Sequence, residues 1–167
     1  MIRILLYAAI GLAFALLSLT GYTAPYTVTH SMTGYALLLH AALAPLFSLC
    51  LAVWAVVYAP RRVFTEEDWL WLRRRDRGEE RAAHGLAFGK KVCFWLILIA
   101  SLPMILSMTL NMFPLFSAQT QPIVISVHYV SVILLTIGVL GYAGCSWAQM
   151  DPDRYFAPEE KSRADGE

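Results

Sequence analysis

Four long apolar stretches without a charged residue dominate the hydropathy pattern of this 167-residue chain. Each has about the 20 residues that a helix needs to cross the hydrocarbon core of a bilayer. We therefore predict an all-α protein, an integral membrane four-helix bundle. The four predicted spans cover residues 4–22, 34–59, 92–112 and 122–148.

The composition agrees with a membrane protein. Hydrophobic residues make up 58% of the chain and charged residues 15%, which is far from the globular average. A soluble domain of this length could not bury four such stretches. We expect one membrane domain over residues 1–150 and a polar tail over residues 151–167. The net charge of +1 gives no indication of nucleic-acid binding, and the three cysteines do not form a C-x-x-C-H motif for covalent haem attachment.

The charged residues predict the orientation of the spans. The 13 basic and 12 acidic residues all fall in the N-terminus, the loop 60–91 or the tail. The opposite loops, residues 23–33 and 113–121, carry no charge. By the positive-inside rule, both termini and the loop 60–91 are cytoplasmic. We expect a multi-pass protein of the bacterial inner membrane, in contact with lipid.

The long loop has a helical pattern of its own, and we predict an interfacial helix at about residues 65–84. Acidic residues follow Thr65 and basic residues begin at Arg73, an order that suits the helix dipole. The alternative is a solvated connector, and we expect His84 to be solvated. Arginines would meet anionic headgroups. The side chains expected to enter the interface are Trp69, Trp71 and Leu72.

Histidines are the candidate functional residues. The spans contain no Lys, Arg, Asp or Glu, but His40 and His128 lie inside two of them, and His30 lies just before one. A polar ring in hydrocarbon is costly and needs a partner. A haem iron can be that partner without a charged residue beside it. The alternative is an imidazole that is hydrogen bonded to a helix carbonyl.

The depths of two histidines predict a shared ligand. The stretch from His40 to Ala59, at the inner end of its span, is as long as the stretch from His128 to Trp147. At a helical rise of 1.5 Å per residue, both histidines are about 28 Å from the inner boundary. Two imidazoles at one depth can bind one noncovalent haem b from opposite faces. We therefore predict His40 and His128 as metal ligands in the outer half of the bilayer.

His30 is the alternate partner of His128. It shares a helical face with Gly34. Counting from the outer ends favours His30 if the second helix begins near Thr27, but that helix would have about 32 residues, too long for a bilayer. We prefer His40 as the ligand. The histidine that does not bind iron is expected to contact a haem propionate or a quinone.

Four short features carry a family resemblance. They are Thr20-Gly21, Gly89-Lys90-Lys91-Val92-Cys93-Phe94-Trp95, Phe113-Pro114-Leu115-Phe116 and His128. Together they resemble the cytochrome b subunit of membrane-bound formate dehydrogenase and its relatives in thiosulfate reductase-type complexes. In that family they correspond to the end of the first helix, the start of the third, the outer turn and the outer haem ligand of the fourth. Lys90 stands where glutamine is usual.

The resemblance also predicts a lost cofactor site. The family holds two b haems, and the positions of its inner haem ligands correspond to Tyr7 and Tyr142 here. Because both ligands are replaced by the same residue, we expect the inner haem to be absent and the outer haem to be kept. Tyr7 and Tyr142 would then fill the vacated inner site. A tyrosinate ligand that retains the inner haem is the alternative.

The family passes electrons between an outer-face partner and quinone. The resemblance therefore implies a subunit of an oxidoreductase complex that holds one haem b and is not catalytic alone. Its expected partners are a periplasmic redox protein, of iron–sulfur or cytochrome c type, and the quinone pool. One alternative is a haem-free membrane anchor or assembly subunit of a larger complex. Another is a small transporter, although the spans lack acids.

Overall fold

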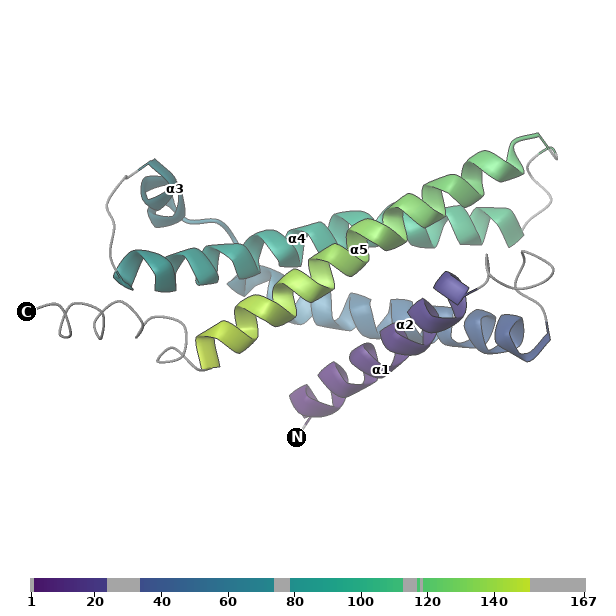
Figure 1. The fold of residues 1–167 in the computed structure, drawn as a ribbon, viewed down its shortest axis with the longest axis horizontal. Coiled ribbons are helices and arrows are strands. Elements are labelled where there is room, and N and C mark those ends of the chain that lie inside the picture. The colour runs from purple at the N-terminus through teal and green to yellow at the C-terminus, as the bar shows by residue number, and fades with distance from the viewer. Residues whose placement is uncertain (1, 24–33, 74–78, 113–116, 118, 151–167) are drawn as a thin grey trace, which may run out of the picture. The chain divides into compact units, whose positions relative to one another are not determined.

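The computed structural model describes residues 2–23, 34–73, 79–112, 117 and 119–150, and in these residues it contains helices and no strand. Four of the helices are long and apolar enough to cross a membrane, which confirms the prediction of an all-α chain with four candidate spans. Figure 1 shows the helices. They are α1 (Ile2–Thr23), α2 (Gly34–Tyr58), α3 (Glu66–Arg73), α4 (Glu79–Met112) and α5 (Gln121–Met150), with a 3-10 turn, η2, at Ala59–Arg61.

The chain divides into two compact units, residues 1–61 and 62–167. In the first unit α1 packs on α2, and aromatic rings meet along the contact. The ring centroids of Phe14 and Phe47 are 6.3 Å apart, and those of Tyr7 and Tyr58 are 5.7 Å apart. In the second unit α5 runs antiparallel along α4, and α3 packs beside the first turns of α4 (Figure 1).

Close packing of α4 and α5 depends on glycine at two positions of α5. A Cβ atom at Gly138 would lie 2.9 Å from Ile97 Cγ1, and one at Gly141 would lie 2.7 Å from Cys93 Sγ. Both distances are too short for real contacts, so only glycine lets α4 approach this closely. At Gly144 a Cβ atom would meet nothing within 4 Å.

Two helix boundaries differ from the sequence-based expectation. Helix α4 begins at Glu79, more than three turns before the predicted start of the third span at Val92. The expected interfacial helix at residues 65–84 is not one element, because α3 ends at Arg73 and residues 79–84 belong to α4. Charged residues mark where a helix leaves the hydrocarbon, but they do not end it. The start of α2 agrees with the prediction. Its first residue, Gly34, has a φ of 60°, which lies outside the right-handed helical region.

Most of the apolar surface of the four long helices faces outward. Only 6% to 28% of the most apolar window of each helix is buried inside the protein. Exposed leucines occur on every long helix, for example Leu5 (64%), Leu49 (64%), Leu102 (63%) and Leu140 (65%). Apolar surface of this extent is unstable in water. Contact with membrane lipid is therefore the environment that these helices require.

Candidate functional site

His128 lies on α5 with its ring directed toward α4. Its Nδ1 atom is 3.2 Å from the carbonyl oxygen of Met104, and the residue is half-buried. A carbonyl oxygen only accepts hydrogen bonds, so Nδ1 carries the hydrogen. In the neutral ring, the lone pair is then on Nε2. His128 is therefore oriented with its basic nitrogen on the side of the ring away from Met104.

His40 lies on α2 and has an equivalent hydrogen bond inside the first unit. Its Nδ1 atom is 2.8 Å from Thr20 Oγ1 on α1. The Thr20 hydroxyl also lies 2.8 Å from the carbonyl oxygen of Leu16 and 3.1 Å from that of Leu17. Where its single hydrogen is donated to α1, Thr20 Oγ1 accepts from His40 Nδ1–H. A Cβ atom at Gly21 would lie 3.5 Å from His40 Cε1, so the Thr20-Gly21 pair contacts the ring.

His128 thus has the tautomer that suits a metal ligand, and His40 has it when Thr20 donates its hydrogen to α1. Ligating histidines commonly donate the other ring N–H to a carbonyl or another polar group, which fixes the ring and raises the basicity of the ligating nitrogen. The residues fit axial ligation in this respect. The described residues contain no group of three or more His, Cys, Asp or Glu that could hold a metal ion, but an axial pair needs only two imidazoles.

The structure does not bring the predicted haem ligands together in one unit. His40 belongs to residues 1–61 and His128 to residues 62–167, so their pairing stays a prediction. His30 lies outside the described residues.

An apolar groove of about 400 Å³ lies on the surface of the second unit, along the α5 turns that precede and follow His128 in the sequence. The hydroxyls of Ser126 and Ser131 donate to carbonyls of their own helix, over 2.9 and 2.7 Å, so they offer the groove little polarity. A hydrocarbon chain suits this lining better than a polar ligand. The groove is lined by Pro103, Ile123, Ser126, Val127, Val130 and Ser131.

The two tyrosines at the expected vacated haem site each have a partner in their own unit. The Tyr7 ring packs against Tyr58 in the first unit. In the second unit, Tyr142 Oη accepts a hydrogen bond of 3.2 Å from Arg62 Nη2. Lys90 Nζ lies 5.9 Å from the centroid of the Tyr142 ring. Sequence reasoning did not predict these two cations beside Tyr142.

A buried carboxylate attaches α3 to α4. Asp68 is 2% exposed, and its Oδ2 atom accepts hydrogen bonds from Lys91 Nζ (2.5 Å), Thr65 N (2.7 Å) and Thr65 Oγ1 (3.0 Å). Burial raises the pKa of Asp68, but the hydrogen bonds from Lys91 and Thr65 and the charge of Lys91 outweigh it and lower the pKa to about 2. The predicted helix start at Thr65 is confirmed, with the Thr65-x-x-Asp68 spacing of a capping box, but sequence reasoning missed the burial of Asp68 and its ion pair with Lys91.

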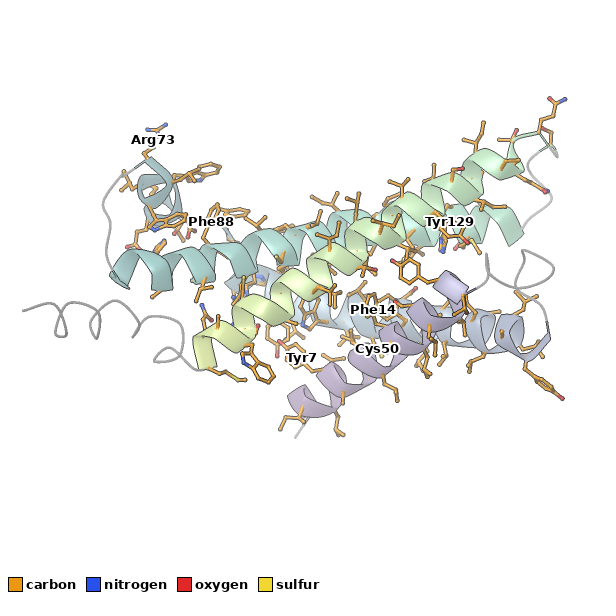
Figure 2. All side chains as sticks on the ribbon, viewed as in Figure 1. Tyr7, Phe14, Cys50, Arg73, Phe88 and Tyr129 are labelled. Atoms are coloured by element: carbon orange, nitrogen blue, oxygen red, sulfur yellow. The ribbon has the colours of Figure 1, made fainter. Side chains whose placement is uncertain are left out.

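The environments of Trp71 and His84 correct two expectations. Trp71 does not point outward with its neighbours, because its ring centroid lies 5.7 Å from that of His84 and 5.4 Å from that of Phe88. Figure 2 shows Phe88 on the side of α4 that faces α3. His84 is half-buried, with Nε2 3.4 Å from Asp68 Oδ1, and so is not simply solvated. Trp69 and Leu72 are exposed, at 55% and 54%.

Comparison of the chain with protein-family models, with curated proteins and with solved structures finds no match. The family resemblance of the four short motifs therefore stays a prediction. What the chain can do has to be inferred from its own residues, chiefly the two intramembrane imidazoles.

Proposed function

We propose that this chain is a membrane cytochrome b subunit that binds one haem b between His128 and His40. The observation that carries this proposal is the hydrogen bond that each of the two rings makes through Nδ1. His128 donates Nδ1–H to the Met104 carbonyl, and His40 Nδ1 is hydrogen bonded to the Thr20 hydroxyl, which can accept in the same way, so that both rings can present the lone pair of Nε2. Two basic imidazole nitrogens in helices without a charged residue are the ligands that a bis-histidyl haem needs.

The positions of the two histidines along their helices support a shared ligand. The stretch from His40 to the end of η2 at Arg61 is almost as long as the stretch from His128 to the end of α5 at Met150. Helices α2 and α5 are both expected to run from the outer to the inner face, so these stretches correspond to nearly equal depths. The expected haem therefore lies in the outer half of the bilayer.

The protein would hold this haem, bury it and orient its two ligands, whereas one-electron transfer is the chemistry that a bound haem supplies. Electrons would pass between a redox protein on the outer face, of iron–sulfur or cytochrome c type, and the quinone pool. His30 is the candidate contact to quinone or to a propionate, and the alternate ligand if His40 does not bind iron. Tyr7 and Tyr142 would occupy the place of a second, inner haem.

The topology belongs to the same proposal. Both termini and the segment that contains α3 are placed in the cytoplasm, and the chain is placed in a bacterial inner membrane. The support is the charge distribution, since all 25 charged residues lie on one side of the predicted spans. The outer partner would then dock near the uncharged loops at residues 23–33 and 113–121.

Haem stoichiometry tests the proposal directly. A pyridine haemochrome assay on the purified full-length chain is expected to give one haem b per wild-type chain and none for His128→Ala and His40→Ala. His84→Ala is the matched control and is expected to keep one haem, because His84 contacts α3. Retention by His40→Ala with loss in His30→Ala would make His30 the ligand. A wild-type protein without a Soret band would end the proposal.

A haem-free membrane anchor or assembly subunit is the second candidate. The observation that favours it is that each ring already has a hydrogen-bond partner inside its own unit, Thr20 for His40 and Met104 for His128. In that case the histidines only attach neighbouring helices. His40→Ala and His128→Ala would then leave assembly with the partner complex unchanged, as measured by co-purification of the partner subunits.

A further inference from the structure

Two cations are held against one tyrosine ring in the second unit. Arg62 Nη2 donates to Tyr142 Oη over 3.2 Å, and the guanidinium carbon of Arg62 lies 5.7 Å from the centroid of the Tyr142 ring. Lys90 Nζ lies 5.9 Å from the same centroid and donates to Gln149 Oε1 over 2.7 Å. The three segments that contribute are the residue after η2, the first half of α4 and the last turns of α5. Two like charges are thus brought to one place.

The cations are positioned by the fold and are not loose surface side chains. Trp95 Nε1 donates to the carbonyl oxygen of Arg62 over 2.9 Å, which fixes the backbone of Arg62 on α4. Both Arg62 and Lys90 are half-buried, so each has lost part of its hydration. A desolvated charge without an opposite charge is costly, and a second charge of the same sign adds to the cost.

No counter-charge is present among the described side chains. Asp68, the buried carboxylate of α3, is bonded to Lys91. Among the three carboxylates whose side chains the structure describes, Glu66, Glu67 and Asp68, none lies within salt-bridge distance of Arg62 or Lys90. An external anion would balance the pair.

We propose that Arg62 and Lys90 form a binding site for the phosphate group of an anionic phospholipid. A guanidinium pairs with two phosphate oxygens through parallel N–H bonds, and an ammonium adds a point charge. The site lies at headgroup level, because Lys90 and Lys91 are the last charged residues before the uncharged stretch 92–112, and Gln149 is next to the end of α5. Basic pockets between helix ends at this level bind anionic headgroups.

Lipid-dependent stabilisation of the full-length chain in a neutral detergent tests this site. The thermal midpoint is measured with increasing phosphatidylglycerol, with phosphatidylcholine and with inorganic phosphate. Phosphatidylglycerol is expected to raise the midpoint in a saturable way, and the other two to raise it far less. Arg62→Gln and Lys90→Gln are each expected to weaken the apparent affinity for phosphatidylglycerol about tenfold, the usual size for a charge-assisted hydrogen bond.

Two sets of variants serve as controls. Arg73→Gln removes one positive charge from a side chain that points away from α4 in Figure 2, and is expected to change the affinity by a factor of about three or less. Arg62→Lys and Lys90→Arg keep both charges and are expected to retain saturable binding. If Arg62→Gln and Lys90→Gln lose phosphatidylglycerol binding while Arg62→Lys and Lys90→Arg keep it, the loss of binding cannot be a general folding defect.

Three results would overturn the proposal. The first is unchanged affinity in Arg62→Gln and Lys90→Gln, and the second is an equal loss in Arg73→Gln, which would show a diffuse charge effect. The third is equal protection by inorganic phosphate, which would make a free anion the ligand in place of a lipid. The assay does not measure haem, so its outcome is distinguishable from that of the cytochrome proposal.

Discussion

At the scale of single residues, one hydrogen bond decides what each intramembrane imidazole can do. Met104 accepts from Nδ1–H of His128, which leaves Nε2 as the basic nitrogen, and His40 presents Nε2 in the same way when Thr20 accepts from its Nδ1–H. The sequence located these rings because a histidine in an uncharged span is conspicuous. It could not reveal their tautomers, because Met104 contributes a backbone oxygen, and any residue at that position would supply the same acceptor.

Thr20 is the partner whose side chain can be changed. Thr20→Val removes the acceptor for His40 Nδ1–H and keeps the shape, whereas Thr20→Ser keeps a hydroxyl. If His40 is an axial ligand, Thr20→Val is expected to weaken haem binding about 10- to 100-fold, the usual effect of losing such a supporting hydrogen bond. Thr20→Ser is expected to bind as the wild type does. Haem titration monitored by the Soret band, together with the redox midpoint, measures the effect. Equal affinity in both variants would argue against His40 as the ligand.

Asp68 is expected to dominate the attachment of α3. Asp68→Asn removes the charge that Lys91 faces in a site where Asp68 is only 2% exposed. Breaking a buried ion pair on one side typically costs about 3 kcal/mol. Glu67→Gln, at an exposed position of the same helix, is expected to cost less than about 0.5 kcal/mol. Thermal unfolding in detergent, followed by tryptophan fluorescence, compares the two variants.

The attachment of α3 is also expected to depend on acid pH. The pKa of Asp68 in the folded protein is about 2, below its ordinary value of 3.8. The carboxylate therefore stabilises the fold fully above about pH 4, and this contribution, about 2 kcal/mol, is lost as the pH falls toward 2. Trp71 fluorescence is expected to report the release of α3 in this window. Asp68→Asn is expected to abolish this pH dependence, and a transition that persists in that variant would have another origin.

At the scale of helices, hydropathy predicted the spans because lipid contact needs an apolar exterior, and the helices that form are apolar over those residues. It did not predict that α4 begins at Glu79, because a polar helix outside the membrane has no hydropathy signal. It also placed Trp71 in the interface with Trp69, since sequence spacing cannot show that α4 provides His84 and Phe88 as partners. The position of the Trp71 side chain is thus determined by contacts with a second helix, which the local sequence pattern does not show.

The contact between α4 and α5 can be tested with glycine substitutions. Gly144→Ala meets no atom within 4 Å and is expected to stabilise α5 by up to about 1 kcal/mol through helix propensity. Gly138→Ala would place Cβ 2.9 Å from Ile97 Cγ1 and is expected to cost about 1–3 kcal/mol. Gly141→Ala clashes with Cys93 Sγ, so Cys93→Ala is expected to rescue it in a double-mutant cycle. Thermal midpoints in detergent show whether each substitution stabilises or destabilises the protein. Equal effects of Gly138→Ala and Gly144→Ala would contradict this packing.

At the scale of the whole molecule, the segments before and after α4 should lie on opposite faces of a membrane if α4 spans it. Glu67 on α3 and Ser117 between α4 and α5 are both exposed, so each can be labelled. In a variant whose Cys50, Cys93 and Cys145 are replaced by alanine, Ser117→Cys is expected to react with an impermeant maleimide in intact cells. Glu67→Cys is expected to react only after permeabilisation.

The physical reason for this orientation is the positive-inside rule, because the loop 60–91 carries nine of the 13 basic residues and residues 113–121 carry none. The labelling experiment tests separately whether α4 crosses the bilayer and in which direction it runs. Labelling of both cysteines from one side would mean that α4 does not cross the bilayer. Labelling with the sides exchanged would keep α4 as a span but reverse its direction. His128 would then lie in the cytoplasmic half, and a redox partner on the outer face could not reach the haem that it is proposed to hold.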